Sequence, residues 1–183
     1  MQQPTVVDRL YDEFKSLVKY LEQDNEVSFR ITVDENFRKV LLLAAASHFE
    51  NCITNHILEF AHEISNENEL LVSFIKNKAV SRQYHSYFDW TSTNANKFFG
   101  LFGDLFSSHI KELLKNDNSL SSSVKAFLEI GNERNRLVHQ NFGTFSLEKN
   151  SEEIYQLYKS ASAFVDTFPC ELRQCLLINK DSG

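Results

Sequence analysis

The stretch from Asp34 to about Ser65 carries the longest apolar pattern in the chain and constrains the fold most. Its apolar residues recur every three or four positions, as they do on one face of an α-helix. We therefore expect one long central helix that begins with Asp34 as its cap and packs on several sides. The preceding segment, Glu26–Val33, alternates only in part and is expected to be a loop. The stripe consists of Phe37, Leu41, Ala45, Phe49, Ile53, Ile57, Phe60 and Ile64.

Helix-breaking residues are scarce along the rest of the chain. Five Gly and two Pro in 183 residues favour long helices joined by short links over a sandwich with many turns. An apolar content of 42% and a charged content of 24% are ordinary for a globular chain of this kind. The sequence therefore predicts the all-α class and a single domain over residues 1–183, long enough for a substantial core.

Local signals place the ends of the last two long helices. Lys115–Ser123 is expected to be a turn whose serines cap the next helix, and that helix is expected to stop near Gly143. Asn150 and Glu153 have the spacing of a capping box, which predicts the start of the final helix. Pro169 is expected to end it.

Composition also bounds the compartment and the partners. The N-terminus lacks a basic start followed by an apolar run, so it does not read as a secretory signal. The longest apolar run, Val40–Ala46, is far shorter than the roughly 18 residues that span a bilayer. No membrane partner is therefore expected. The chain has three cysteines, Cys52, Cys170 and Cys175, and no C-x-x-C pair. This odd number favours reduced thiols and a cytoplasmic location. The net charge of −6 argues against coating of long nucleic acid, so any RNA contact should be local.

The helix over Phe127–Phe142 contains a defect in its apolar stripe. Continuing the stripe from Gly131 leads to Asn135, a polar side chain where an apolar one is expected. A buried amide without partners costs about 1–3 kcal/mol, so Asn135 is either hydrogen-bonded inside the fold or facing a cleft. The rest of the stripe is Val124, Phe127, Leu128, Gly131 and Val138.

Arg134, Asn135 and His139 form the candidate catalytic set. His139 follows Asn135 by one helical turn, and the long side chain of Arg134 can reach the same place. A permanent cation, an amide and an imidazole together suit the handling of a phosphate. The alternative has Arg134 in solvent and His139 at a helix C-terminus, where the helix dipole favours a cation.

A second candidate site lies on the long helix, where His48, Cys52 and His56 follow one another at intervals of four residues. A zinc site would need a further ligand or water and a deprotonated thiol. The three positions drift round the helix and cannot easily meet one ion. A core thiol with two boundary imidazoles is the better account, and no metal or cofactor is expected.

Tyr84, Tyr87, Phe88 and Trp90 concentrate in the polar segment Ser81–Asn94. Aromatic rings in such a place can stack the bases of a nucleic acid. More often such rings pin a long loop to the core, so packing is the favoured reading and base stacking is the alternative.

The segment from Arg134 to His139 resembles the Arg-x(4–6)-His signature of the HEPN superfamily, in which a polar residue often follows the Arg. The order of segments is similar to the RiboL-PSP type of HEPN domain. There, a long second helix precedes an aromatic, Asn-containing segment (here Phe88–Gly103), the motif helix and a final amphipathic helix. The resemblance covers roughly Asp34 to Phe168.

This resemblance implies a HEPN-like helical bundle with long antiparallel helices and short additional helices. It implies a metal-independent endoribonuclease of toxin or antiviral defence type, which cleaves RNA such as tRNA or mRNA by attack of the ribose 2′-hydroxyl. HEPN domains pair so that two motifs face each other, which implies a homodimer with His139 from each copy in one cleft. Gly131 could allow the helices to approach there, or could serve packing within the chain. An antitoxin or another defence-system protein is a further implied partner.

A non-catalytic HEPN-like module that binds RNA or a partner protein is the alternative function. In that version Asn135 and His139 only satisfy each other or seat the partner. The acidic net charge favours this alternative, and the intact Arg-Asn-x3-His set favours the ribonuclease.

Overall fold

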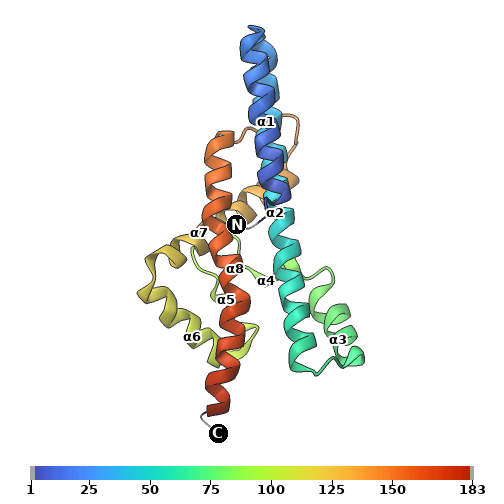
Figure 1. Ribbon diagram of the computed structural model, residues 1–183, viewed down its shortest axis with the longest axis vertical. Helices are drawn as coiled ribbons and strands as arrows, with labels where there is room; N and C mark the ends of the chain where they lie inside the picture. Colours follow the sequence, from blue (N-terminus) through green and yellow to red (C-terminus); the bar gives the residue numbers. More distant parts are fainter. Residues whose placement is uncertain (1–2, 182–183) are drawn as a thin grey trace. The chain divides into compact units, whose positions relative to one another are not determined.

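The computed structural model describes the backbone of residues 3–181 and the side chains of residues 3–177 (Figure 1). Every regular element in this described part is helical, which confirms the predicted all-α class. The elements are α1 (Val6–Gln23), α2 (Val27–Ile64), α3 (Glu69–Ile75), the π-helical turn η1 (Lys76–Val80), α4 (Tyr84–Tyr87), α5 (Asn96–Gly100), α6 (Gly103–Asn116), α7 (Asn118–His139) and α8 (Ser151–Asp181).

The chain divides into two compact units that are each discontinuous in sequence. The first unit comprises Met1–His48 and Ile130–Lys159, and the second comprises Phe49–Glu129 and Ser160–Gly183. The helices α2, α7 and α8 each pass from one unit into the other along the chain. The two units are described separately below, and a single domain over residues 1–183 stays a prediction.

A helical hairpin opens the first unit. α1 begins with a capping box in which the backbone amide of Asp8 donates to Thr5 and the backbone amide of Thr5 donates to Asp8. α1 then lies alongside the first half of α2 (Figure 1), and the rings of Phe14 and Phe37 stack with centroids 3.8 Å apart. This stack buries apolar surface between two helices that are joined by a turn of only three residues.

The long helix α2 starts earlier than the sequence predicts. Glu26–Val33 was expected to be a loop, but α2 begins at Val27 and Asp34 lies inside it rather than capping it. Phe29 and Ile31 are exposed, so their partial alternation does not mark a buried strand face. Asp34 instead binds Arg38, with 2.8 Å between the Asp34 Oδ2 and Arg38 Nη2 atoms, and accepts a hydrogen bond from Ser151 at 2.8 Å.

The start of α8 is tied to α1 by tyrosines and carboxylates. Asn150 and Glu153 form the predicted capping box, with both reciprocal hydrogen bonds present at 2.8 and 2.9 Å. Tyr155 donates to the Asp8 carboxylate at 2.7 Å, and the Lys159 ammonium lies 3.3 Å from the same oxygen. Burial pushes the pKa of Asp8 up, but the hydrogen bonds from Thr5, Tyr155 and Lys159 outweigh it and lower the pKa to about 2.

The lowered pKa of Asp8 predicts a loss of stability in acid. The carboxylate is held below its ordinary pKa of 3.8, so its contribution is present above that value and is lost as the pH falls towards about 2. We expect Asp8→Asn to reduce the free energy of unfolding near neutral pH by about 2 kcal/mol and to flatten its dependence between pH 3.8 and about 2. Urea unfolding at a series of pH values measures both effects. Asp12→Asn, at an exposed acid on the same helix, is the matched control and should change stability little.

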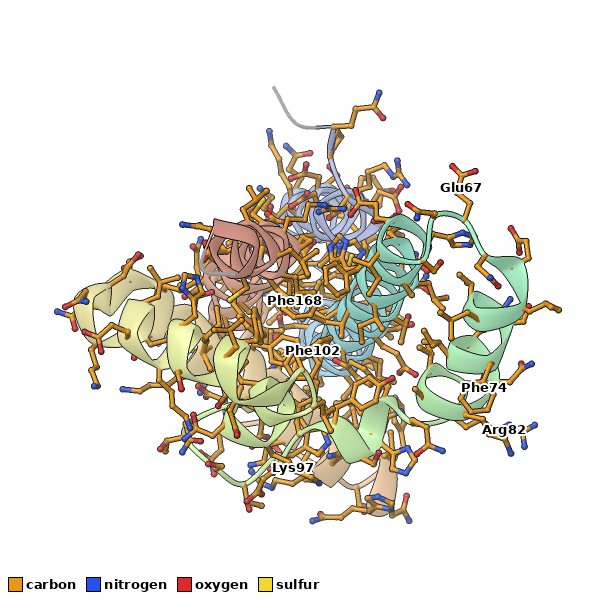
Figure 2. The ribbon with its side chains drawn as sticks, turned by 90° about the horizontal axis from the view of Figure 1, so that it is seen from below. Glu67, Phe74, Arg82, Lys97, Phe102 and Phe168 are labelled. Atoms are coloured by element: carbon orange, nitrogen blue, oxygen red, sulfur yellow. The ribbon has the colours of Figure 1, made fainter. Side chains whose placement is uncertain are left out.

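The second unit is built round a cluster of aromatic rings. Phe98 stacks on Phe88 with centroids 4.5 Å apart and packs against Phe168 at 5.0 Å. Phe127 of α7 joins the cluster through Phe164, 5.1 Å away. Figure 2 shows Phe102 and Phe168 among the packed side chains and Phe74 and Arg82 at the periphery. This core fixes the first half of the helix that later carries the candidate site.

Two expected helix boundaries within the second unit are wrong. Asp117, rather than the serines after it, caps α7, because its carboxylate accepts from the Leu120 amide at 2.9 Å. Ser123 lies buried inside the helix, where its hydroxyl accepts from the Phe164 amide at 2.6 Å. Pro169 also does not end α8, which continues to Asp181. An internal proline costs a helix about 3 kcal/mol. Leu172 and Cys175, which lie after Pro169, are buried, and their packing stabilises the continued helix.

The described residues contain no helix that is both long and apolar enough to cross a bilayer. The three cysteines, Cys52, Cys170 and Cys175, are free thiols.

Candidate active site

The candidate site occupies the last two turns of α7, within the first unit. Leu137 anchors these turns because its side chain is fully buried. Arg134 and Asn135 are half-buried, and Val138 and His139 are exposed. The helix ends at His139, four residues before the predicted stop at Gly143, so His139 is its last residue. The last carbonyls of a helix have no partner within the helix.

Arg134 and Asn135 are brought together directly. The Arg134 Nη1 atom donates to the Asn135 side-chain oxygen at 3.1 Å. Asn135, the polar residue in the apolar stripe, therefore has a hydrogen-bond partner within the fold. Asn135 can therefore hold the guanidinium in place. His139 is exposed and is not joined to either residue by a hydrogen bond among the described residues.

Two neighbouring arginines on α7 differ in their ion pairing. Arg136 is paired with Glu133 at 2.6 Å, and its guanidinium lies 5.6 Å from the ring centroid of Phe145. Arg134 has no carboxylate partner within the part of the chain that the structure describes. A half-buried guanidinium without a counter-charge keeps its paired donors available for an anionic ligand.

The segment after α7 is fastened to α2 by residues that the sequence did not single out. Lys39 of α2 is only 7% exposed, and its Nζ atom donates to the Phe142 carbonyl at 2.6 Å. Arg38 donates to the Leu147 carbonyl at 3.4 Å. In the sequence, Lys39 reads as an ordinary surface lysine one turn after Glu35, so no local pattern indicates its burial. These contacts set where the chain goes directly after His139.

The family model described as RiboL-PSP-HEPN matches residues 8–174 of this sequence. The chain belongs to the RiboL-PSP-HEPN family. The match confirms the resemblance drawn from the Arg134–His139 signature and extends it beyond Asp34–Phe168 at both ends. No curated protein and no solved structure matches the chain. The HEPN family includes ribonucleases, which makes an RNase-type function the coarse expectation for this domain.

The aromatic segment of this HEPN domain serves its packing. Tyr87 and Phe88 are buried, and the Trp90 indole donates to the His85 carbonyl at 2.9 Å. The Trp90 ring lies 4.8 Å from Phe88, and Tyr84 lies 5.6 Å from Trp90, centroid to centroid. Of the two readings of this loop, the contacts favour the one in which the rings pin it to the core of the second unit.

His48, Cys52 and His56 of α2, the candidate zinc ligands, contact other side chains in the structure. Within the described residues no group of three or more His, Cys, Asp or Glu side chains is placed to hold one. Burial, followed by the charges of Asp166 and Glu59, raises the pKa of the Cys52 thiol, which disfavours the thiolate that zinc needs. The His48 ring packs edge-on against Tyr158, 5.8 Å between centroids, and His56 Nδ1 lies 3.5 Å from a Glu59 oxygen.

Proposed function

We propose that this HEPN domain is a metal-independent endoribonuclease of the toxin or defence type, with Arg134, Asn135 and His139 as its catalytic set. One observation supports the proposal most. Arg134 has no carboxylate partner and is oriented by Asn135, whereas Arg136, two residues on, is neutralised by Glu133. Leaving a half-buried cation without a counter-charge costs stability, which packing of the helix alone does not account for.

The proposed chemistry needs nothing beyond RNA itself. The ribose 2′-oxygen loses its proton and forms a bond to the adjacent phosphorus, and the bond from phosphorus to the 5′-oxygen breaks. The leaving oxygen takes up a proton, so the products are a 2′,3′-cyclic phosphate and a 5′-hydroxyl. His139 carries an imidazole, the side chain that most often serves as a general acid or base, and it is exposed where a substrate can reach it. The Arg134 guanidinium stabilises the charge that develops on the phosphate oxygens.

A test of this function is cleavage of a mixed-sequence RNA in the presence of EDTA. We expect cleavage to persist in the chelator and to leave cyclic phosphate ends, because the proposed steps use side chains alone. Mass spectrometry of the fragments identifies those ends. Loss of cleavage in EDTA that a divalent ion restores would contradict the proposal and would direct attention back to His48, Cys52 and His56.

A homodimer is part of the proposal, because one imidazole cannot easily remove one proton and supply another in the same step. Gly131 is buried within the chain and does not offer the surface for such contact. Val138 and Phe142, on either side of His139 in the sequence, are instead 46% and 44% exposed. Apolar side chains of this size next to a candidate site are suited to contact with a second copy.

We expect light scattering to show a dimer, and Val138→Glu to give a monomer that no longer cleaves RNA. A charge placed at the centre of an apolar contact has to be desolvated without a partner, which opposes association. Leu70→Glu on α3, where the leucine is 85% exposed, is the matched control and should leave the dimer intact. A strict monomer of the wild type at high micromolar concentration would count against the shared site.

A non-catalytic module that binds a partner protein is the second candidate function. It is favoured by the exposed apolar side chains of α3, where Leu70, Leu71 and Phe74 all face outward (Figure 2 labels Phe74). Such side chains can seat a partner, including an antitoxin or another defence-system protein. Wild-type protein that never cleaves RNA under any of the conditions above would favour this function over the enzyme.

A further inference from the structure

Lys39 carries a buried charge that nothing in the described structure neutralises. Its Nζ atom has one hydrogen-bond partner, the Phe142 carbonyl at 2.6 Å, and lies 5.0 Å from the centroid of the Phe142 ring. No carboxylate among the described residues lies within 4.0 Å of it. An ammonium has three donors, and the Phe142 carbonyl accepts from one of them in a side chain that is only 7% exposed. The other donors can bind an anion that comes within hydrogen-bond distance of them.

A carboxylate that could have neutralised Lys39 is present one turn earlier on the same helix. Glu35 precedes Lys39 by four residues, which is the favourable order for an ion pair on a helix. The two side chains nevertheless form no ion pair, because Lys39 turns towards the Phe142 carbonyl and Glu35 stays exposed. The adjacent Arg38 differs, since Asp34 matches its charge at 2.8 Å. Among the described residues, no ion pair therefore matches the charge of Lys39.

The Lys39 side chain lines a small polar pocket of about 240 Å³. Glu35 and Arg38 of α2 form one side of this pocket, and residues 143–147 of the segment after α7 form the other. Pockets that bury whole drug-sized ligands measure about 300–1,000 Å³, so this one suits a group the size of a phosphate. The Glu35 carboxylate also faces the pocket and opposes an anion there.

We propose that Lys39 and this pocket bind a backbone phosphate of the RNA that lies next to the phosphate being cut. The proposal rests on the proposed ribonuclease function, because one side of the pocket is formed by residues 143–147, which begin four residues after His139. Arg134 then holds the scissile phosphate and Lys39 the neighbouring one. In this scheme Lys39 binds the RNA backbone and fixes the position of the strand. It takes no part in proton transfer.

The test measures binding of a fluorescent mixed-sequence 2′-O-methyl RNA, which cannot be cleaved, over a series of salt concentrations. For a single strand, each phosphate contact makes the slope of log affinity against log salt more negative by about 0.7. We expect Lys39→Met to make that slope less negative by about 0.7 and Lys39→Arg to leave it unchanged. Lys19→Met, which removes an exposed charge from α1, should leave the slope unchanged. Glu35→Gln should bind the RNA more tightly, because it removes the opposing charge from the pocket.

The outcomes separate this proposal from the one on which it rests. Wild-type protein that neither binds nor cleaves RNA overturns both. Wild-type protein that cleaves RNA, with an unchanged slope and a lower melting temperature in Lys39→Met, overturns the phosphate site alone and leaves Lys39 as a clamp for the Phe142 segment. If Lys39→Met does not fold, Glu35→Gln decides, and an unchanged affinity in that variant overturns the phosphate site.

Discussion

His139→Ala should cleave RNA about 10²–10⁴-fold more slowly than the wild type, with no change in fold or assembly. In the proposed mechanism His139 transfers protons, so its removal slows cleavage. It should lie at the upper end of this range, because both copies of a shared site lose the imidazole at once. The fold should survive because His139 is exposed at the end of α7 and makes no hydrogen bond among the described residues.

The measurement pairs a cleavage rate with a melting temperature on the same protein. His62→Ala, at a half-buried histidine near the end of α2, is the matched control and should cleave like the wild type. A structural role for His139 gives the opposite pattern, with a lower melting temperature and no effect in any RNA assay. That pattern would make the end of α7 a packing feature.

Arg134→Ala should lower the cleavage rate about 10²–10³-fold, the loss that follows removal of one group that stabilises charge in a transition state. Arg134→Lys should restore little of it, because an ammonium cannot present the paired, coplanar donors of a guanidinium. Asn135→Ala should cost less, because Asn135 acts on Arg134 through the single hydrogen bond of 3.1 Å and need not touch the RNA.

Arg136→Ala gives this prediction its control. It removes an arginine from the same turn, but one that is already paired with Glu133 at the surface. We expect it to reduce stability by at most about 1 kcal/mol and to leave cleavage near the wild-type rate. Equal losses in Arg134→Ala and Arg136→Ala would show that general basicity of the helix matters, and not one oriented guanidinium.

The sequence predicted the elements whose apolar stripe is continuous and buried. The stripe of α2 from Phe37 onward is an example, since Leu41, Ala45, Phe49 and Ile53 are buried as expected. The start of α2 was missed because its apolar residues Phe29 and Ile31 lie two positions apart and are exposed, so the segment lacks the three-to-four-residue spacing of a buried helical face. The extension past Pro169 was missed because a local rule against proline was overridden by the packing of Leu172 and Cys175.

The candidate site divides in the same way. Arg134, Asn135 and His139 could be found because they lie within six residues of one helix, where spacing alone places side chains near one another. Lys39 could not, because its partner, the Phe142 carbonyl, lies 103 residues further along the chain. Every residue has a backbone carbonyl, so the identity of a residue does not indicate that its carbonyl accepts from a distant lysine. Such a contact depends on the path of the chain.

The discontinuity of the first unit also fixes when the site can form during synthesis. Asp8 and Asp34 must wait for Tyr155 and Ser151, which a ribosome working at about 5–20 residues per second delivers on the order of ten seconds after the first 48 residues. The hydrogen bonds that tie the start of α8 to α1 and α2 are therefore absent until residues 151–159 have emerged from the exit tunnel. Under the proposed function, a nascent chain would cut none of the RNA beside it before that point.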